Sequence, residues 1–129
     1  MRSQQIYLHS YDWTVQIFYN VPSSKVDTIR RHLQALACHS RPLEDACLLV
    51  YQSTPDTAFT YTNISLHRTL IVLCPSSSPS QFLNTLTHEL LHATTHISDY
   101  YHIPLNTEPP CYLLGSLAQA SYSIAQYYL

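Results

Sequence analysis

Apolar residues recur at every second position in the first twenty residues, and this alternation predicts β-strands over residues 5–9 and 13–20. A third alternating segment covers residues 58–62. The continuous apolar run over residues 69–74 is typical of a strand buried on both faces. A short segment, residues 63–67, separates the last two strands, so we expect them to form a hairpin.

In the remaining segments the apolar spacing changes to three and four residues, which predicts four helices. The first begins at a capping Ser24 and runs to about residue 36, and the second covers residues 42–52. The third has the strongest start signal, because Ser78 and Gln81 form a capping box around a proline in the first helical position. Its apolar stripe continues to Ile97. The fourth helix runs from residue 108 or 109 to about 127.

The chain contains a single glycine, Gly115, which lies inside the fourth predicted helix. Glycine in a helix interior costs about 1 kcal/mol relative to alanine. We therefore expect Gly115 to mark a close contact between two helices, with the third helix as its neighbour.

Composition narrows the class of protein. A length of 129 residues suits a single domain over residues 1–129. A net charge of -2 and six scattered Lys and Arg residues argue against a nucleic-acid partner. The chain start does not resemble a signal peptide and no apolar run approaches membrane length, so we expect a cytoplasmic protein without a membrane partner. Charged residues make up only 11%, which favours association into a homo-oligomer or a larger assembly.

The four cysteines, at positions 38, 47, 74 and 111, show no C-x-x-C spacing. A cysteine-ligated zinc is therefore not expected. Thiols stay reduced in the cytoplasm, so we expect free and mostly buried side chains. Two disulfide bridges are the alternative if the protein is secreted.

The candidate chemistry is concentrated in the third helix, where His88-Glu89-Leu90-Leu91-His92 forms an H-E-x-x-H motif. Residues four apart lie on one face of a helix, so His88 and His92 can both reach one metal ion. Glu89 then lies beside that ion, where a carboxylate can accept a proton from water. The motif predicts a zinc site with Glu89 as general base.

A catalytic zinc site needs a third protein ligand, for which His96, Asp99, His102 and Glu108 are candidates. His96 stands about 12 Å from His88 along the helix, so one ion cannot bind both together with His92. Asp99 and His102 require a sharp turn directly after the helix. Glu108 begins the next helix and would complete a His/His/Glu set, with His102 as its best competitor.

With these residues, the chain resembles small zincin metallopeptidases of the gluzincin type. It is also similar to short H-E-x-x-H proteins encoded by bacteria, phages and mobile elements, in which a glutamate opens the following helix and a tyrosine lies four residues later. Glu108 and Tyr112 match that arrangement. The resemblance implies that His88, His92 and Glu108 bind Zn²⁺ and that Glu89 is the catalytic base. For Tyr112, two roles stay open: support of the ligands, or simple packing.

The resemblance also implies an α+β, zincin-like fold: a small, mostly antiparallel sheet of three to four strands packed on helices. The H-E-x-x-H helix lies under the sheet, and the strand at residues 57–62 forms the rim of the cleft. An extended peptide or protein substrate adds to that exposed strand edge. The implied function is zinc-dependent peptide hydrolysis. The alternative is a non-enzymatic, metal-binding structural or interaction protein of a phage or mobile element.

Overall fold

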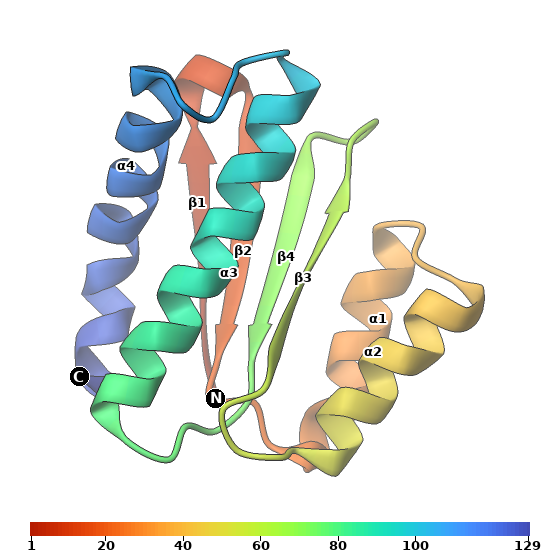
Figure 1. The fold of residues 1–129 in the computed structure, drawn as a ribbon. Coiled ribbons are helices and arrows are strands. Elements are labelled where there is room, and N and C mark those ends of the chain that lie inside the picture. Colours follow the sequence, from red (N-terminus) through yellow and green to blue (C-terminus); the bar gives the residue numbers. More distant parts are fainter.

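The computed structural model describes residues 1–129 and contains four strands and four α-helices in an α+β arrangement (Figure 1). The strands are β1 (Arg2–Leu8), β2 (Trp13–Tyr19), β3 (Ala58–Asn63) and β4 (Arg68–Leu73). The helices are α1 (Val26–Ala35), α2 (Ser40–Gln52), α3 (Pro79–Tyr100) and α4 (Glu108–Ala125). Short 3-10 turns occupy His9–Tyr11, Ser23–Lys25 and Gln126–Tyr128. Each of the four strands and four helices overlaps the segment that the apolar spacing predicts, but β1 spans residues 2–8 instead of the predicted 5–9, because His9 belongs to a 3-10 turn.

The sheet is mixed, with the strand order β1-β2-β4-β3. β1 pairs with β2 and β3 pairs with β4 in antiparallel fashion, whereas β2 and β4 run parallel. The parallel pair arises because α1, α2 and β3 together form the crossover that brings the chain back to β2. The predicted hairpin of β3 and β4 is confirmed, and it leaves β3 at the edge of the sheet.

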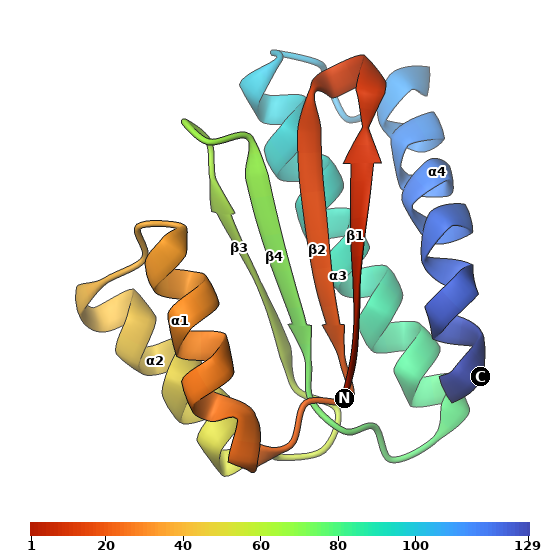
Figure 2. The ribbon, with the colours of Figure 1, turned by 180° about the vertical axis from the view of Figure 1, so that it is seen from behind.

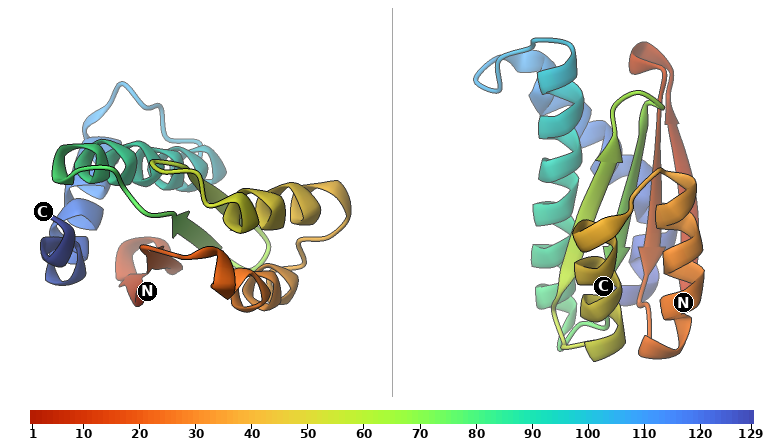
Figure 3. Two further views of the ribbon diagram at one scale, coloured as in Figure 1. Left: turned by 90° about the horizontal axis from the view of Figure 1, so that it is seen from below. Right: turned by 90° about the vertical axis from the view of Figure 1, so that its right-hand side faces the viewer.

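Helices cover both faces of the sheet (Figures 1 and 2). On one face, α3 and α4 pack against inward-facing residues of β1, β2 and β4 in a core that includes Trp13, Ile17, Leu90 and Leu117. On the other face, α1 and α2 form a second core with residues of β2 and β4. The two helices lie at the right of the left-hand view in Figure 3. The alternation of β2 explains this division, because successive side chains of a strand point to opposite faces.

The start of α3 follows its sequence signal. The Ser78 hydroxyl accepts a hydrogen bond from the Gln81 amide at 3.1 Å, and Pro79 occupies the first turn. The start of α1 does not: Ser24 is no cap, because residues 23–25 form a 3-10 turn and the helix begins only at Val26. The prediction of a capping Ser24 is therefore wrong.

All four cysteines are free thiols, and three of them, Cys38, Cys47 and Cys74, are buried. Burial raises the pKa of these three thiols. Cys111 is exposed near the start of α4. No helix combines the length and the hydropathy that a bilayer span requires.

Gly115 does not mark a close contact between helices. A Cβ atom built on Gly115 would meet nothing within 4 Å, and the residue is exposed on α4. The prediction that Gly115 packs against α3 is wrong, because the helices meet through other residues of α4, such as Leu113 and Leu117.

We therefore expect Gly115→Ala to stabilise the protein by about 0.5–1 kcal/mol, since alanine loses less conformational entropy in a helix and meets no obstacle here. The midpoint of urea unfolding measures the change. The exposed Ala118, three residues later on the same helix, is the matched control, and Ala118→Gly should destabilise by a similar amount. A destabilised Gly115→Ala variant would mean that this position is crowded in solution.

Candidate metal centre

The two histidines of the H-E-x-x-H motif meet on the exposed flank of α3. The Nε2 atoms of His88 and His92 are 3.1 Å apart, and the ring centroids are 4.8 Å apart. Both side chains are exposed. The helix itself produces this pairing, because residues four apart project in nearly the same direction.

The separation of the two nitrogens suits a shared metal ion. Zinc binds imidazole nitrogen at about 2.0–2.1 Å, so two ligands of a tetrahedral site lie about 3.3 Å from each other. The 3.1 Å between the His88 and His92 nitrogens is close to this value. The distance is therefore compatible with two corners of a zinc coordination sphere, and it equally fits a hydrogen bond between the two rings.

Glu89 lies on the adjacent face of α3, turned toward the sheet. Only 6% of its surface is exposed, and its Oε2 atom accepts a hydrogen bond from the Thr60 hydroxyl at 2.5 Å. Thr60 is the single protein donor to this carboxylate. A buried carboxylate with one fixed oxygen and one free oxygen is well suited to accept a proton from a small molecule beside it.

The strand that supplies Thr60 is β3, the edge strand of the sheet. Ala58, Thr60 and Thr62 share its α3-facing side, and the Thr62 hydroxyl contacts Nδ1 of His96 at 2.8 Å. Burial, and next the neighbouring His92, lower the pKa of His96. The expectation that residues 57–62 form a strand beside the motif is confirmed. His96 is directed toward β3 instead of joining the histidine pair.

An open groove of about 340 Å³ lies between the start of β3 and the first half of α3. Its walls include His88 and Glu89 on α3, Asp56 and Thr57 before β3, and Leu49 on α2. Ser77 donates to both carboxylate oxygens of Asp56, from its amide at 2.8 Å and its hydroxyl at 2.6 Å. These hydrogen bonds lower the pKa of Asp56. The groove thus places two carboxylates and one histidine around a space that a substrate can enter.

The structure does not bring Glu108 to the histidine pair. Glu108 opens α4, and one turn later Tyr112 is 71% exposed and lines a different cavity with Tyr7 and His9, beside β1. Glu89 contacts β3, at the opposite edge of the sheet. Three strand spacings separate β1 from β3, or about 14 Å. Figure 1 shows the same arrangement, with α4 on one side of α3 and β3 on the other.

No group of three or more His, Cys, Asp and Glu side chains is close enough to hold a metal ion. His102 lies beyond the C-terminal end of α3, and that end, at Tyr100, is already about 12 Å of helix from His92. The gluzincin-type set of His88, His92 and Glu108 is therefore not assembled in this structure. Glu108 as third ligand, and Tyr112 as its support, stay predictions.

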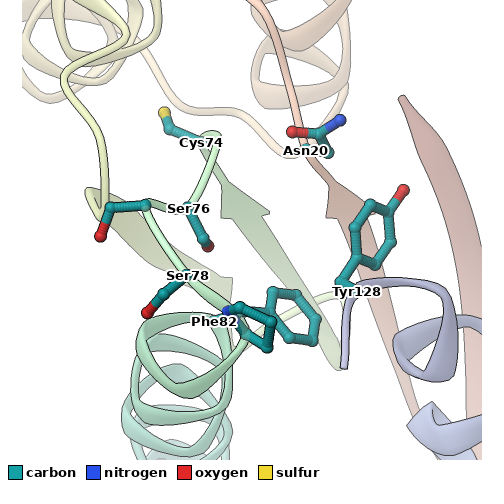
Figure 4. Close-up of a pocket in the computed structure, with 8 residues that line it drawn as sticks. Asn20, Cys74, Ser76, Ser78, Phe82 and Tyr128 are labelled. Carbon is teal, nitrogen blue, oxygen red and sulfur yellow. The ribbon is translucent and has the colours of Figure 1, made fainter.

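A separate cavity of about 260 Å³ lies at the N-terminal end of α3 (Figure 4). Serines 76 and 78 line one side of it, and Phe82 and Tyr128, with ring centroids 5.1 Å apart, line the other. Pro79, in its wall, precedes His88 by nine residues, or about 13 Å of helix. This cavity is therefore distinct from the groove at the histidine pair.

Comparison of the chain with protein-family models, with curated proteins and with solved structures finds no match. The α+β class and the four-stranded sheet rest on the structure itself.

Sequence reasoning did not find Thr60 or Asp56. The signal for Thr60 is present, because a strand over residues 58–62 places Ala58, Thr60 and Thr62 on one face. The sequence predicts that this strand forms the rim of the cleft, but it does not show which of the two faces of the strand meets α3. Asp56 carries no motif, and its place in the groove depends on the turn that precedes β3.

Proposed function

We propose that this protein is a zinc-dependent peptide hydrolase whose reaction takes place where α3 meets the edge of β3. One observation carries the proposal: two imidazole nitrogens 3.1 Å apart stand beside a carboxylate that is buried and fixed by a hydrogen bond. Two histidines that only share an exposed helix face do not require a buried carboxylate beside them. A metal-assisted hydrolase needs both parts.

His88 and His92 would hold the metal through their Nε2 atoms. When bound, zinc supplies Lewis acidity toward a carbonyl oxygen and toward water. Glu89 accepts a proton from the water that attacks the scissile carbonyl, and it delivers that proton to the leaving amine. The carbon–oxygen bond forms and the carbon–nitrogen bond breaks, so no further reactant is required. Thr60 orients the Glu89 carboxylate.

The free edge of β3 is suited to hold the substrate. The Cys74 amide donates a hydrogen bond to the Thr57 carbonyl. This bond shows which residues of β3 direct their backbone groups toward β4 and which direct them away from it. In an antiparallel pair, alternate residues point their backbone groups outward, and in β3 these residues are Ala58, Thr60 and Thr62. An extended peptide can pair with these groups, and Thr60 then brings its backbone close to Glu89.

A second function is favoured by a different observation, namely that only two ligands of the predicted set come together. A zinc ion held by two histidines and a partner's side chain would join proteins without catalysis. In that case the chain is a non-enzymatic, metal-binding interaction protein. The two functions differ in whether peptide bonds are cleaved.

The test is to incubate the purified protein with one equivalent of zinc and a mixed peptide library, and to identify products by mass spectrometry. We expect cleavage that stops with a chelator and returns when zinc is restored. Stoichiometric zinc binding without any cleavage would support the interaction protein instead. Cleavage that is unaffected by chelation would overturn the role of the metal.

A further inference from the structure

A second groove lies on the other side of β3, and its character differs from that of the groove at His88. It has a volume of about 290 Å³ and runs between β3 and α2. Six of its nine lining residues are hydrophobic, among them Leu33, Ala46, Leu49, Phe59 and Tyr61. In Figure 1, α2 lies on the opposite side of β3 from α3.

The two grooves are connected through shared residues. Leu49 lines both of them, and Thr60, which holds Glu89, also lines the apolar groove. The apolar groove lies on the α2 face of the sheet, and the groove at His88, called the polar groove from here on, lies on the α3 face. The outward backbone groups of β3 therefore lie between the two grooves. A peptide paired with β3 would send alternate side chains into the two grooves.

The polar groove is lined by acidic residues and by no Lys or Arg. The acidic residues are Asp56 and Glu89. The two ion pairs of the protein join Arg30 to Glu44 and Arg41 to Asp45, so Asp56 has no cationic partner within the chain. Hydrogen bonds from Ser77 favour its ionised form. Asp56, which is not among the residues that would hold the metal, therefore offers a negative charge to a basic side chain in the groove.

We propose that the substrate is an extended peptide that places an apolar side chain in the groove beside α2 and a basic side chain next to Asp56. This inference rests on the proposed function for the position of the reacting bond, and it specifies the substrate class. Because the two grooves lie on opposite faces of the sheet, the apolar and the basic residue must be an odd number of positions apart. A spacing of one or three fits, since Asp56 and Ala58 line one groove and Phe59 to Tyr61 the other.

Binding of fluorescein-labelled peptides to the Glu89→Gln variant tests this specificity without any cleavage. The peptides have about eight residues, enough to span β3 at about 3.3 Å per residue, and carry one Leu and one Lys in an Ala and Thr background. We expect a spacing of three to bind about tenfold tighter than a spacing of two, because only the former buries the leucine while the lysine faces Asp56. Replacing Lys by Glu should weaken binding further.

Two variants assign the effect to the grooves. Asp56→Asn should reduce the preference for Lys over Gln by about two- to fivefold, whereas Asp27→Asn, on the exposed side of α1, should leave it unchanged. Ala46→Glu should remove the preference for leucine. Equal binding of both spacings, or a Lys preference that survives Asp56→Asn, would overturn the inference.

The binding and cleavage experiments distinguish a failure of this specificity from a failure of the proposed hydrolase function. If wild-type protein cleaves peptides without regard to Leu and Lys, the function stands and the specificity is wrong. If the spacing preference appears in binding but no peptide is cleaved, the binding site stands and the hydrolase is wrong.

Discussion

Glu89→Gln is expected to abolish peptide cleavage while the protein stays folded and keeps its zinc. Glutamine has the size of glutamate and can still accept the hydrogen bond from Thr60, so the buried site is preserved. Its amide cannot take a proton from water. General bases typically contribute about 10²–10⁴-fold to rate, and we expect a loss of kcat of that order. Initial rates at saturating zinc, with metal content measured on the same samples, give the result.

Thr60→Val tests the same mechanism through a smaller expected loss of activity. Valine keeps the shape of threonine but removes the hydroxyl that fixes Glu89, so we expect a smaller loss of kcat than for Glu89→Gln. Thr94→Val is the matched control, because its buried hydroxyl donates only to the Leu90 carbonyl within α3. Full activity in Glu89→Gln would remove this carboxylate from the mechanism.

The second large effect is expected in zinc affinity. His88→Ala and His92→Ala should each weaken zinc binding by at least about 100-fold, since each removes a direct ligand and even indirect support of a ligand is worth about 10–100-fold. His96→Ala is the control on the same helix, because its ring faces Thr62 and not the pair. Competition with a chromogenic chelator measures the three constants. Equal affinities in all variants would place the zinc elsewhere.

The same assay decides the role of the third predicted ligand. The resemblance to gluzincins predicts that Glu108→Ala loses much of the zinc while His102→Ala keeps it. In the structure, α4 lies on the far flank of α3, so such a loss requires α4 to move when zinc binds. If Glu108→Ala binds zinc normally, the gluzincin assignment is wrong, and the third ligand comes from another chain or from solvent.

Local patterns predicted the elements because they are set by short-range physics. The alternation around Trp13 and the N-terminal cap at Ser78 each follow from backbone geometry within a few residues. The 3.6-residue period likewise placed His88 and His92 on one face, and their nitrogens are within 3.1 Å. The prediction of the histidine pair depends on nothing outside α3.

Contacts between segments far apart in the sequence cannot be predicted in this way. The insertion of β4 between β2 and β3 is a property of the whole chain, and it decides that Thr60 meets Glu89. The position of Glu108 depends on where α4 packs, and the spacing of 16 residues after His92 left the return path open. The prediction of a close helix contact at Gly115 is wrong for the same reason. The surroundings of Gly115 depend on which side of α4 faces α3.

A crystal structure of the zinc-loaded protein, with anomalous scattering recorded at the zinc edge, tests the central claim most directly. We expect one strong anomalous peak at about 2.0–2.1 Å from the Nε2 atoms of both His88 and His92, with Glu89 next to it and outside the coordination sphere. The same map would identify the third ligand. A histidine pair without a peak at saturating zinc, or a peak bound to other residues, would contradict the proposal that α3 carries a metal-dependent hydrolase site.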